Sequence, residues 1–367
     1  MTKAAELAKM GEVLTNSQIG GRRNIIINGA MQVFQRGTSH TSITTSGYRA
    51  DRFRSAISNL GTWTITQDSD APSGFINSLK YDCTTADASP AASNNIFIQH
   101  KIEGQNVQHL KKGTSDAEKV TIQFYVKCNK TGNVQCNIRD RDNTRQISSI
   151  ITINSANTWE KKVFTIVGDT TGTLDNDNES SFEIEWWLDA GSNYTTGTPP
   201  TAWEAVAETD RGAGTTISLG DSTDNYFQLT GVQMEIGEQA TPFEHRSFGE
   251  EETLCRRYYM LIDDGSSTSA FANSTCYTAD TSYAVIPLNP PMRATPSIDQ
   301  VTGSNYYQCM SNYGGRQFNS FTLSSGNSTA KYARINNADT ISGTTQGFSG
   351  WFKTAVTSAY IAFDAEL

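Results

Sequence analysis

The chain has 367 residues, a length that suits two or three domains. Hydrophobic residues make up 37% of it and charged residues only 18%, so much of its polarity comes from Ser, Thr, Asn, Gln and 29 Gly, a composition typical of strands and turns. The net charge of −9 argues against a direct nucleic-acid partner, and no stretch approaches the roughly 18 apolar residues of a membrane span, so we also expect no membrane insertion.

The first predicted element is a helix over residues 2–15. An apolar stripe recurs at helical spacing, formed by Leu7, Met10, Val13 and Leu14. Because so short a helix is marginal alone, the stripe must pack on sister copies, on a docking protein or on the chain's own first domain. We therefore interpret residues 1–23 as a helix and linker for attachment or oligomerisation. The segment lacks the apolar region and cleavage site of a signal peptide, so we expect synthesis in a cytosol.

Residues 24–248 read as a series of short strands separated by turn formers. A strand, a tight turn at Asn28-Gly29 and a second strand are predicted within residues 25–35. Further strand-like runs follow at 62–67, 77–82, 95–102, 119–127, 133–139, 148–153, 159–167, 181–188, 215–219 and 226–235. With almost no helix between them, these runs predict an antiparallel β-sandwich rather than βαβ units.

The stretch "YFQLTGVQMEI", residues 226–236, is predicted to close this sandwich. Gly231 interrupts its alternation, and a glycine inside a strand indicates a bulge or a close backbone approach. Downstream, Pro242 cannot donate to a β-ladder. Residues 250–252 are Glu and residues 256–257 are Arg, which matches the dipole of a helix over 249–258. We therefore place a connecting segment at 249–259 and a domain boundary near residue 250.

Residues 260–367 are expected to form a second, smaller β-sandwich at the tip of the molecule. Strand-like runs such as "TSYAVIPL", "AKYARI", "GWFKTA" and "AYIAFDAEL" recur to the end of the sequence. The six cysteines show no zinc-ligand spacing, so we expect buried, reduced thiols. The predicted fold class is therefore all-β: an N-terminal helix, a jelly-roll sandwich, a short linking helix and a C-terminal sandwich.

An ordered series of segments resembles a known family. In chain order these are "RRNIIINGAMQVFQRG", "YRADRFR", "KIEGQNVQHL", "VTIQFYVKCNKTG", "TWEKKVFTIVGDTTGT", "EIEWWLDAGSNYTTGT" and "LTGVQMEIGEQATPFEHRSFGEEETLCRRYY". The series resembles bacteriophage tail-fibre and related virion proteins, of a marine-phage type, with a jelly-roll domain like a carbohydrate-binding module. The likeness covers roughly residues 1–260. It implies a structural virion protein, a homotrimer made in the host cytoplasm and attached to other virion proteins through its N-terminus.

Aromatic residues are the candidate glycan-binding groups, because sugar C–H faces stack on exposed rings. Adjacent Trp186 and Trp187 must point to opposite faces of a strand, and so must Tyr306 and Tyr307. The predicted binding residues are Trp187, Tyr307, Tyr313 and Trp351. The tip also has the aromatic, Asn and Gly content of recognition loops.

Acidic residues give two weaker candidates. Glu183 and Glu185 share one face of a strand, about 6–7 Å apart, which could serve glycoside hydrolysis, although solvated acids on a strand are common. The run "DNDNES" is either a solvated acidic turn or a structural Ca²⁺ site formed by Asp175, Asp177 and Glu179. No G-x-S-x-G motif occurs, and we expect neither catalysis nor any cofactor other than this calcium ion.

The sequence therefore predicts a tail fibre or receptor-binding appendage that recognises host surface polysaccharide by binding, not by chemistry. Two alternatives stay open: a capsid decoration or head-fibre protein without a ligand, and a polysaccharide depolymerase.

Overall fold

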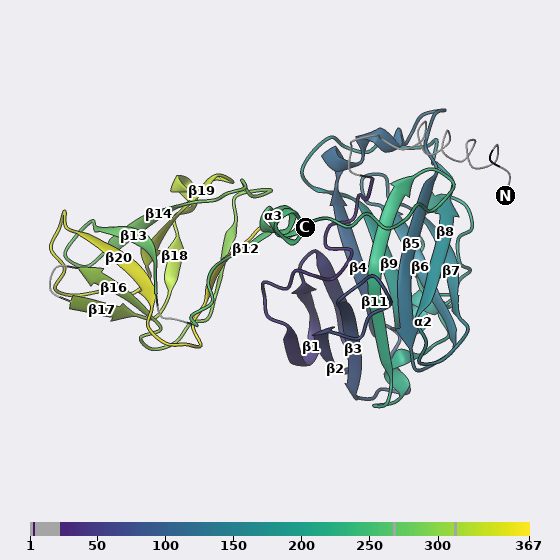
Figure 1. Ribbon diagram of the computed structural model, residues 1–367, viewed down its shortest axis with the longest axis horizontal. Helices are drawn as coiled ribbons and strands as arrows, with labels where there is room; N and C mark the ends of the chain where they lie inside the picture. The colour runs from purple at the N-terminus through teal and green to yellow at the C-terminus, as the bar shows by residue number, and fades with distance from the viewer. Residues whose placement is uncertain (1–2, 4–22, 267–268, 312–313) are drawn as a thin grey trace. The chain divides into compact units, whose positions relative to one another are not determined.

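The computed structural model describes residue 3 and residues 23–266, 269–311 and 314–367 (Figure 1). The chain divides into two compact units, which we call the N-terminal unit (Met1–Glu251, with Leu367) and the C-terminal unit (Glu252–Glu366). Both are built from antiparallel sheet, which confirms the all-β prediction. In the described ranges no helix is long and apolar enough to cross a membrane. The predicted stripe of Leu7, Met10, Val13 and Leu14 lies outside the described residues.

The N-terminal unit has eleven strands over residues 23–251. They are β1 (Ser39–Ala50), β2 (Phe53–Asp68), β3 (Ser78–Thr85), β4 (Asn95–Glu103), β5 (Val120–Cys128), β6 (Gly132–Asp140), β7 (Arg145–Ile153), β8 (Glu160–Ile166), β9 (Ser180–Ala190), β10 (Glu204–Ala205) and β11 (Tyr226–Ile236). Short helical turns interrupt the loops: η1 (Gly104–Asn106), η2 (Gln108–Leu110), α2 (Ser192–Thr195), η3 (Glu208–Asp210) and η4 (Leu219–Asp221).

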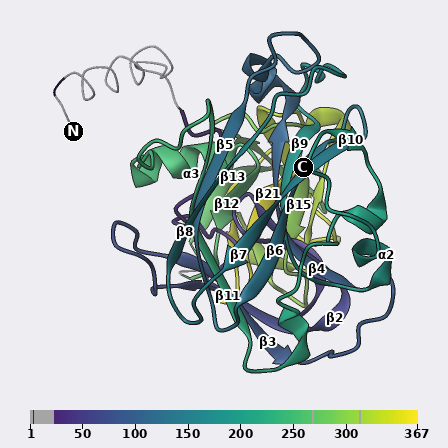
Figure 2. The same ribbon diagram turned by 90° about the vertical axis from the view of Figure 1, so that its right-hand side faces the viewer.

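The long strand β2 belongs to both layers of this unit. Its residues Phe53–Ser58 pair with β4, and its residues Thr62–Asp68 pair with β3. Gly61, between these segments, has a φ of +64°. One layer therefore has the order β10-β7-β6-β9-β4-β2 and the other β2-β3-β11-β5-β8 (Figures 1 and 2). Phe124 of β5 meets Trp186 of β9 edge to face at 5.8 Å, so the layers enclose one core, consistent with a jelly-roll sandwich.

The strand–turn–strand predicted for residues 25–35 is wrong. These residues are irregular and buried, because the Asn28 side chain takes over backbone partners that a neighbouring strand would otherwise supply. Its amide donates to the carbonyl oxygens of Val33 (2.8 Å) and Asp51 (3.0 Å), and its oxygen accepts from the Val33 N–H (2.9 Å). Both Asn28 and Met31 have positive φ, which lies outside the extended region of a regular strand.

A second predicted strand, over residues 215–219, is also absent, because Ser218 has a positive φ and the chain turns into η4. The predicted bulge at Gly231 is present. Gly231 has a φ of +62°, and the register of β11 against β5 shifts between Thr230 and Gln233. All six cysteines are free and buried.

The C-terminal unit begins within α3 (Phe248–Arg256), which overlaps the helix expected at 249–258, and has two sheets. One has the order β12-β21-β15: β12 (Tyr259–Asp263), β21 (Ile361–Asp364) and β15 (Ser297–Gln300). The other, with order β17-β16-β20-β13-β14-β19-β18, contains β13 (Ala270–Cys276), β14 (Ser282–Pro287), β16 (Tyr307–Ser311), β17 (Gly314–Phe318), β18 (Phe321–Leu323), β19 (Tyr332–Asn337) and β20 (Ser349–Thr354). A 3₁₀ turn, η5 (Ser325–Asn327), precedes β19. Both sheets contribute to one core, which includes Met260, Phe363 and Phe352.

Replacing Gly231 by alanine tests the bulge. A Cβ there would lie 2.7 Å from the Phe75 ring and 2.9 Å from the Tyr125 ring. The matched control is G237A, since Gly237 also has a positive φ but open space around it. We expect G231A to lower the free energy of unfolding by about 1–3 kcal/mol more than G237A. Urea denaturation followed by Trp fluorescence measures this, and equal losses would contradict the close approach.

Candidate functional site

The outer face of the β9 layer is the first candidate surface. Along β9 the core side takes Phe182, Ile184, Trp186 and Leu188. Side chains alternate along a strand, so Glu183, Glu185 and Trp187 lie on the outer face. None of the three is open to solvent: Glu183 is 1% exposed, and Glu185 and Trp187 are 0% exposed. Glu185 and Trp187 are covered by the connection between β9 and β11, which includes α2 and η3, whereas Glu183 contacts Gln99 of β4 and Arg141.

Arg211 in this connection holds the cover in place. Its Nη2 donates to Glu185 Oε1 at 2.6 Å, and the Trp187 indole N–H donates to Glu185 Oε2 at 3.0 Å. Trp187 stacks on Phe97 with ring centroids 4.3 Å apart. The Arg211 guanidinium carbon lies 4.9 Å from the Trp187 centroid, and Tyr194 lies against the same ring at 5.2 Å. The chain's own side chains thus bury both the Trp187 and the Phe97 rings.

The two acids of this face are committed to ion pairs. Burial raises the pKa of Glu185, but the charges of Arg211 and Arg139 outweigh that effect, and its pKa lies below the usual value. Glu183 accepts from the Gln99 amide at 3.0 Å and lies 3.5 Å from the Arg141 Nε. A glycosidase needs carboxyl groups that reach the scissile bond from both sides, and these two are buried on one strand face.

Lys112 forms a second buried charge cluster in the same unit. Its ammonium contacts the carboxylates of Asp140 and Asp169, the latter at 3.1 Å. It also donates to the carbonyl oxygens of Thr171 (2.8 Å) and Gly172 (2.9 Å). Four oxygens therefore surround one lysine nitrogen, a set that balances a buried positive charge.

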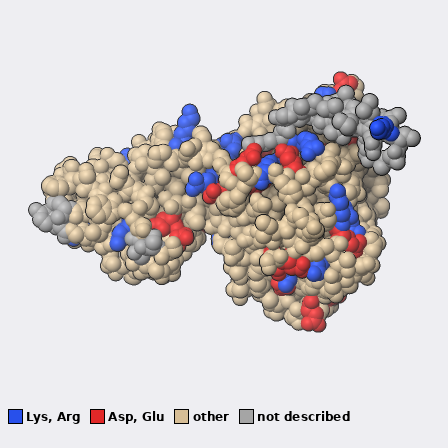
Figure 3. All heavy atoms as spheres, viewed as in Figure 1, with Lys and Arg blue, Asp and Glu red and all other residues tan. Residues whose placement is uncertain are grey.

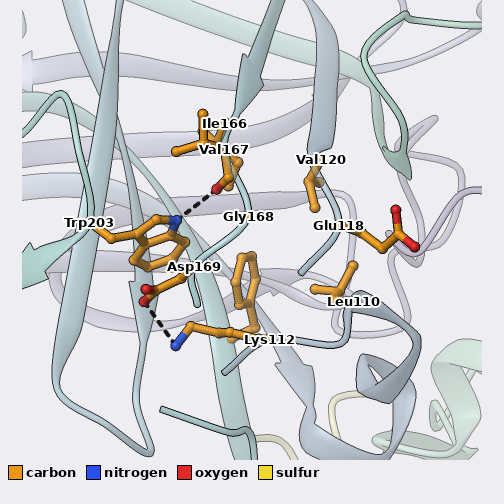
Figure 4. A pocket seen from close by; sticks show the side chains of 10 residues that line it. Leu110, Lys112, Glu118, Val120, Ile166, Val167, Gly168, Asp169 and Trp203 are labelled. Carbon is orange, nitrogen blue, oxygen red and sulfur yellow. Dashed lines mark hydrogen bonds and ion pairs between the residues drawn. The ribbon is translucent and has the colours of Figure 1, made fainter. Parts of the chain in front are cut away.

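A small cavity lies beside this cluster (Figure 4). The Trp203 indole on its wall donates to the Val167 carbonyl at 2.8 Å, and Lys112 and Asp169 pair next to it. The volume is about 10 Å³, which admits no more than one water molecule. The cavity is a packing defect and not a ligand site.

The acidic run predicted to bind calcium lies before β9. Asp177 accepts from the Glu179 backbone N–H at 2.9 Å, and the Asp175 N–H donates to Asp142 at 2.8 Å. Throughout the described ranges, no group of three or more His, Cys, Asp and Glu converges to hold a metal ion. Calcium at Asp175, Asp177 and Glu179 stays a prediction without geometric support here.

The outer face of the seven-stranded sheet in the C-terminal unit is the second candidate surface, and we call it the tip face. Cross-strand pairing places its side chains in rows. One row joins Met310, Trp351 and Asn273 across β16, β20 and β13, and continues with Val285 opposite Arg334 on β14 and β19. Because Cys309, Phe352, Ile286 and Ile335 point into the core, the alternating neighbours in these rows point outward.

Two further rows complete the tip face. Thr275, Tyr283 and Asn336 are neighbours across β13, β14 and β19, and Gln308 pairs with Lys353. Large apolar groups on this face are open to solvent: Trp351 is 45% exposed, Tyr332 42% and Val285 53%. An open sheet face with rings and amides is suited to a flat, hydroxylated ligand.

The four residues predicted to bind glycans have different positions. Trp351 lies on the tip face. Trp187 faces outward, as alternation requires, but is covered by the β9–β11 connection. Tyr307 is wholly buried, and its hydroxyl donates to the carbonyl oxygens of Val301 (2.8 Å) and Tyr360 (2.6 Å), so a ligand has no access to its ring. Tyr313 lies outside the described residues.

Sequence reasoning missed most of the tip face. Tyr283, Val285, Tyr332 and Arg334 were not among its candidates. The alternation of apolar and other residues in the segments "SYAVIP" and "YARINN" could have identified them. The core-facing residues of these segments are Ala284, Ile286, Ala333 and Ile335. The intervening residues are therefore the outward set.

Comparison with known proteins does not assign the chain to a family. No protein-family model matches it, and no curated protein matches it. Solved structures with a detectable likeness include a tailspike protein domain of bacteriophage CBA120 (12% identity, TM-score 0.30), covering 58% of this chain and 21% of that one. A putative sugar-binding protein from Bacteroides thetaiotaomicron (11%, 0.33) covers 59% of this chain and 100% of its own.

A carbohydrate-binding module described in complex with β-1,4-galactotriose is also similar, with 10% sequence identity and a TM-score of 0.29. The match covers 59% of this chain and 100% of that module. The chain thus spans about a fifth of the tailspike chain. At these identities and TM-scores, the likenesses establish neither a family nor a function.

Replacing Lys112 by methionine tests the buried cluster. Without the ammonium, buried Asp140 loses its counter-charge, while Asp169 keeps its ion pair with Arg145 at 2.6 Å, so we expect K112M to cost about 3–5 kcal/mol of unfolding free energy. K111M is the matched control, because Lys111 pairs with Glu118 on the surface. We expect K111M to unfold at nearly the wild-type urea midpoint. Equal midpoints for K112M and K111M would show that the cluster contributes nothing.

The Glu185 ion pair predicts a pH dependence. Because its pKa is lower in the folded state, its stabilisation is fully present above the unfolded value of about 4.3 and is lost as pH falls toward the folded value. Wild type should therefore lose more stability than E185Q between pH 6 and pH 3.5, although E185Q is less stable at pH 6. Urea unfolding at both pH values measures the difference. Parallel curves would contradict the ion pair.

Proposed function

We propose that the protein binds polysaccharide chains through the tip face and does no chemistry on them. The observation that carries this proposal is the exposure of Trp351 in the middle of a sheet face, between Met310 and Asn273. Nearly half of the Trp351 surface is open to solvent. Trp187, the tryptophan on the outer face of β9, is covered. An exposed indole offers a flat apolar surface to the C–H groups of a sugar.

The polar residues of the tip face suit the hydroxyl groups of the same ligand. Asn273 lies across from Trp351, and Gln308 lies on the neighbouring strand β16. Each amide group has both donors and an acceptor, which matches a sugar hydroxyl in either role. Trp351 and the amides are on strands and not on loops, so little ordering is needed on binding.

A binding role without catalysis is consistent with the charges of both surfaces. At the outward positions of β13, β14, β16, β19 and β20 the described chain has no Asp or Glu. The paired acids of the N-terminal unit, Glu183 and Glu185, are buried in ion pairs. A general acid and base would need titratable groups within reach of the substrate.

In the wider proposal the protein is a virion appendage of the tail-fibre type. Residues 1–23 attach it to other virion proteins, and three copies present the tip face to host surface polysaccharide. The sequence resemblance supports this role. Repetition of a weak site on one particle then raises the avidity far above the affinity of one copy.

Binding of the full chain to a microarray of bacterial capsular polysaccharides and lipopolysaccharide O-chains tests the proposal. We expect W351A to lose about 10- to 30-fold in affinity for the polymer that wild type binds most tightly, as for a central aromatic anchor. I76A is the control, because Ile76 is an exposed apolar residue of the N-terminal unit.

Equal affinity of W351A and wild type would remove the tip face as the site. If no polysaccharide binds and W351A instead changes the oligomeric state in sedimentation, the face is a subunit contact. The protein would then be a decoration without a glycan ligand.

A further inference from the structure

The tip face has two positive charges and no balancing acid. Arg334 on β19 and Lys353 on β20 both occupy outward positions, because they pair with Val285 and Gln308. Neither of them forms an ion pair with a described carboxylate. Few charged side chains are visible on the C-terminal unit in Figure 3, so each unbalanced cation has a large local effect.

The acids of the C-terminal unit lie elsewhere. Asp263, Asp299 and Asp364 belong to the three-stranded sheet. Asp299 accepts from the hydroxyls of Tyr259 and Tyr360, both at 2.9 Å. Of the loops that join strands of the tip face, the β13–β14 turn contains Asp280 and the β19–β20 loop contains Asp339, which accepts from the Asn319 N–H. Neither is on a strand, so the central rows of the tip face remain positive.

The Arg334 side chain packs on the ring of Tyr283. Its guanidinium carbon lies 4.5 Å from the centroid of the Tyr283 ring, an arrangement that fixes a long side chain in one place. Its Nε is buried and has no hydrogen-bond acceptor in the described structure. The buried Nε is out of reach of a ligand, so an anion would bind through the Nη donors of the planar guanidinium.

Arg334 and Trp351 mark the two ends of one binding strip. Their strands β19 and β20 are separated by β14 and β13, so the side chains are about 14 Å apart by strand spacing. Lys353 lies two residues along β20 from Trp351, on the same face. A ligand that reaches all three must be a chain of several sugar residues with negative groups along it.

We propose, on the basis of the function proposed above, that the ligand of the tip face is an anionic polysaccharide. Trp351 stacks on a sugar ring, while Arg334 and Lys353 bind carboxylate or sulfate groups of the same chain. Uronic acid and sulfated sugar share this chemistry, and matched pairs of polymers separate them.

The experiment measures binding of the full chain to polygalacturonate and to its fully methyl-esterified form, and to dextran sulfate and dextran. Within each pair the sugar backbone is the same, and only one member has anionic groups. We expect the charged member of at least one pair to bind 10-fold or more tightly than the neutral member, and to weaken as NaCl is raised. Preference for polygalacturonate would identify carboxylate as the anion, and preference for dextran sulfate would identify sulfate.

Variants assign the effect to the two cations. We expect R334Q/K353Q to lose about 10-fold or more of its affinity for the charged polymer and little of its affinity for a neutral one. K331Q is the control for the loss of one positive charge outside the strands, because Lys331 precedes β19, and the single variants R334Q and K353Q are compared with it. W351A should bind both charged and neutral polymers more weakly than wild type does.

Two results would overturn the inference: equal binding of charged and neutral members in both pairs, or wild-type affinity in R334Q/K353Q. Binding to neutral polysaccharides of the microarray, with none to either anionic polymer, would refute the anion preference while the proposed function stands. No binding to any polymer, on the microarray or in these pairs, would refute both.

Discussion

Strand geometry sends alternate side chains to opposite faces, and in both units only one of those faces is buried by the core. The other face must be covered by the chain, balanced by charge, or left open to a partner. In β9 of the N-terminal unit the outward set is Glu183, Glu185 and Trp187, which the chain covers itself. In β20 of the C-terminal unit the outward set includes Trp351 and Lys353, which remain open.

Burial of charge explains why the first surface is closed. Arg211 reaches Glu185 at 2.6 Å and lies over Trp187, so one side chain neutralises the acid and covers the ring. Lys112 does the same for Asp140 and Asp169 elsewhere in that unit. Such pairs are worth little relative to an apolar core, but breaking one leaves a buried charge at high cost. A ligand that reached Trp187 would therefore have to displace this cover by local unfolding. Among the described residues nothing covers Trp351 in this way, and its side chain is 45% exposed.

Local patterns in the sequence predicted most strands, the all-β class and the bulge at Gly231, because each depends on a few neighbouring residues. They did not predict the irregular segment at 25–35, where one side chain, Asn28, replaces a strand partner. Trp187 lies on the outer face of β9, but the side chains that cover it, Phe97, Tyr194 and Arg211, come from other segments that a local pattern does not connect. Tyr307 was a predicted binding residue although it faces the core, and Tyr306 lies before β16 and packs, partly buried, against the same core. Period alone cannot choose between them.

The central claim is that Trp351 contacts a saccharide ligand while Trp187 stays covered. Indole N–H signals of the ¹⁵N-labelled full chain, assigned with W351F and W187F, test it most directly during titration with a polygalacturonate oligosaccharide. The account predicts a large shift of the Trp351 signal and none of the Trp187 signal. A shift of Trp187 with Trp351 unchanged would place the ligand on the β9 layer and contradict it.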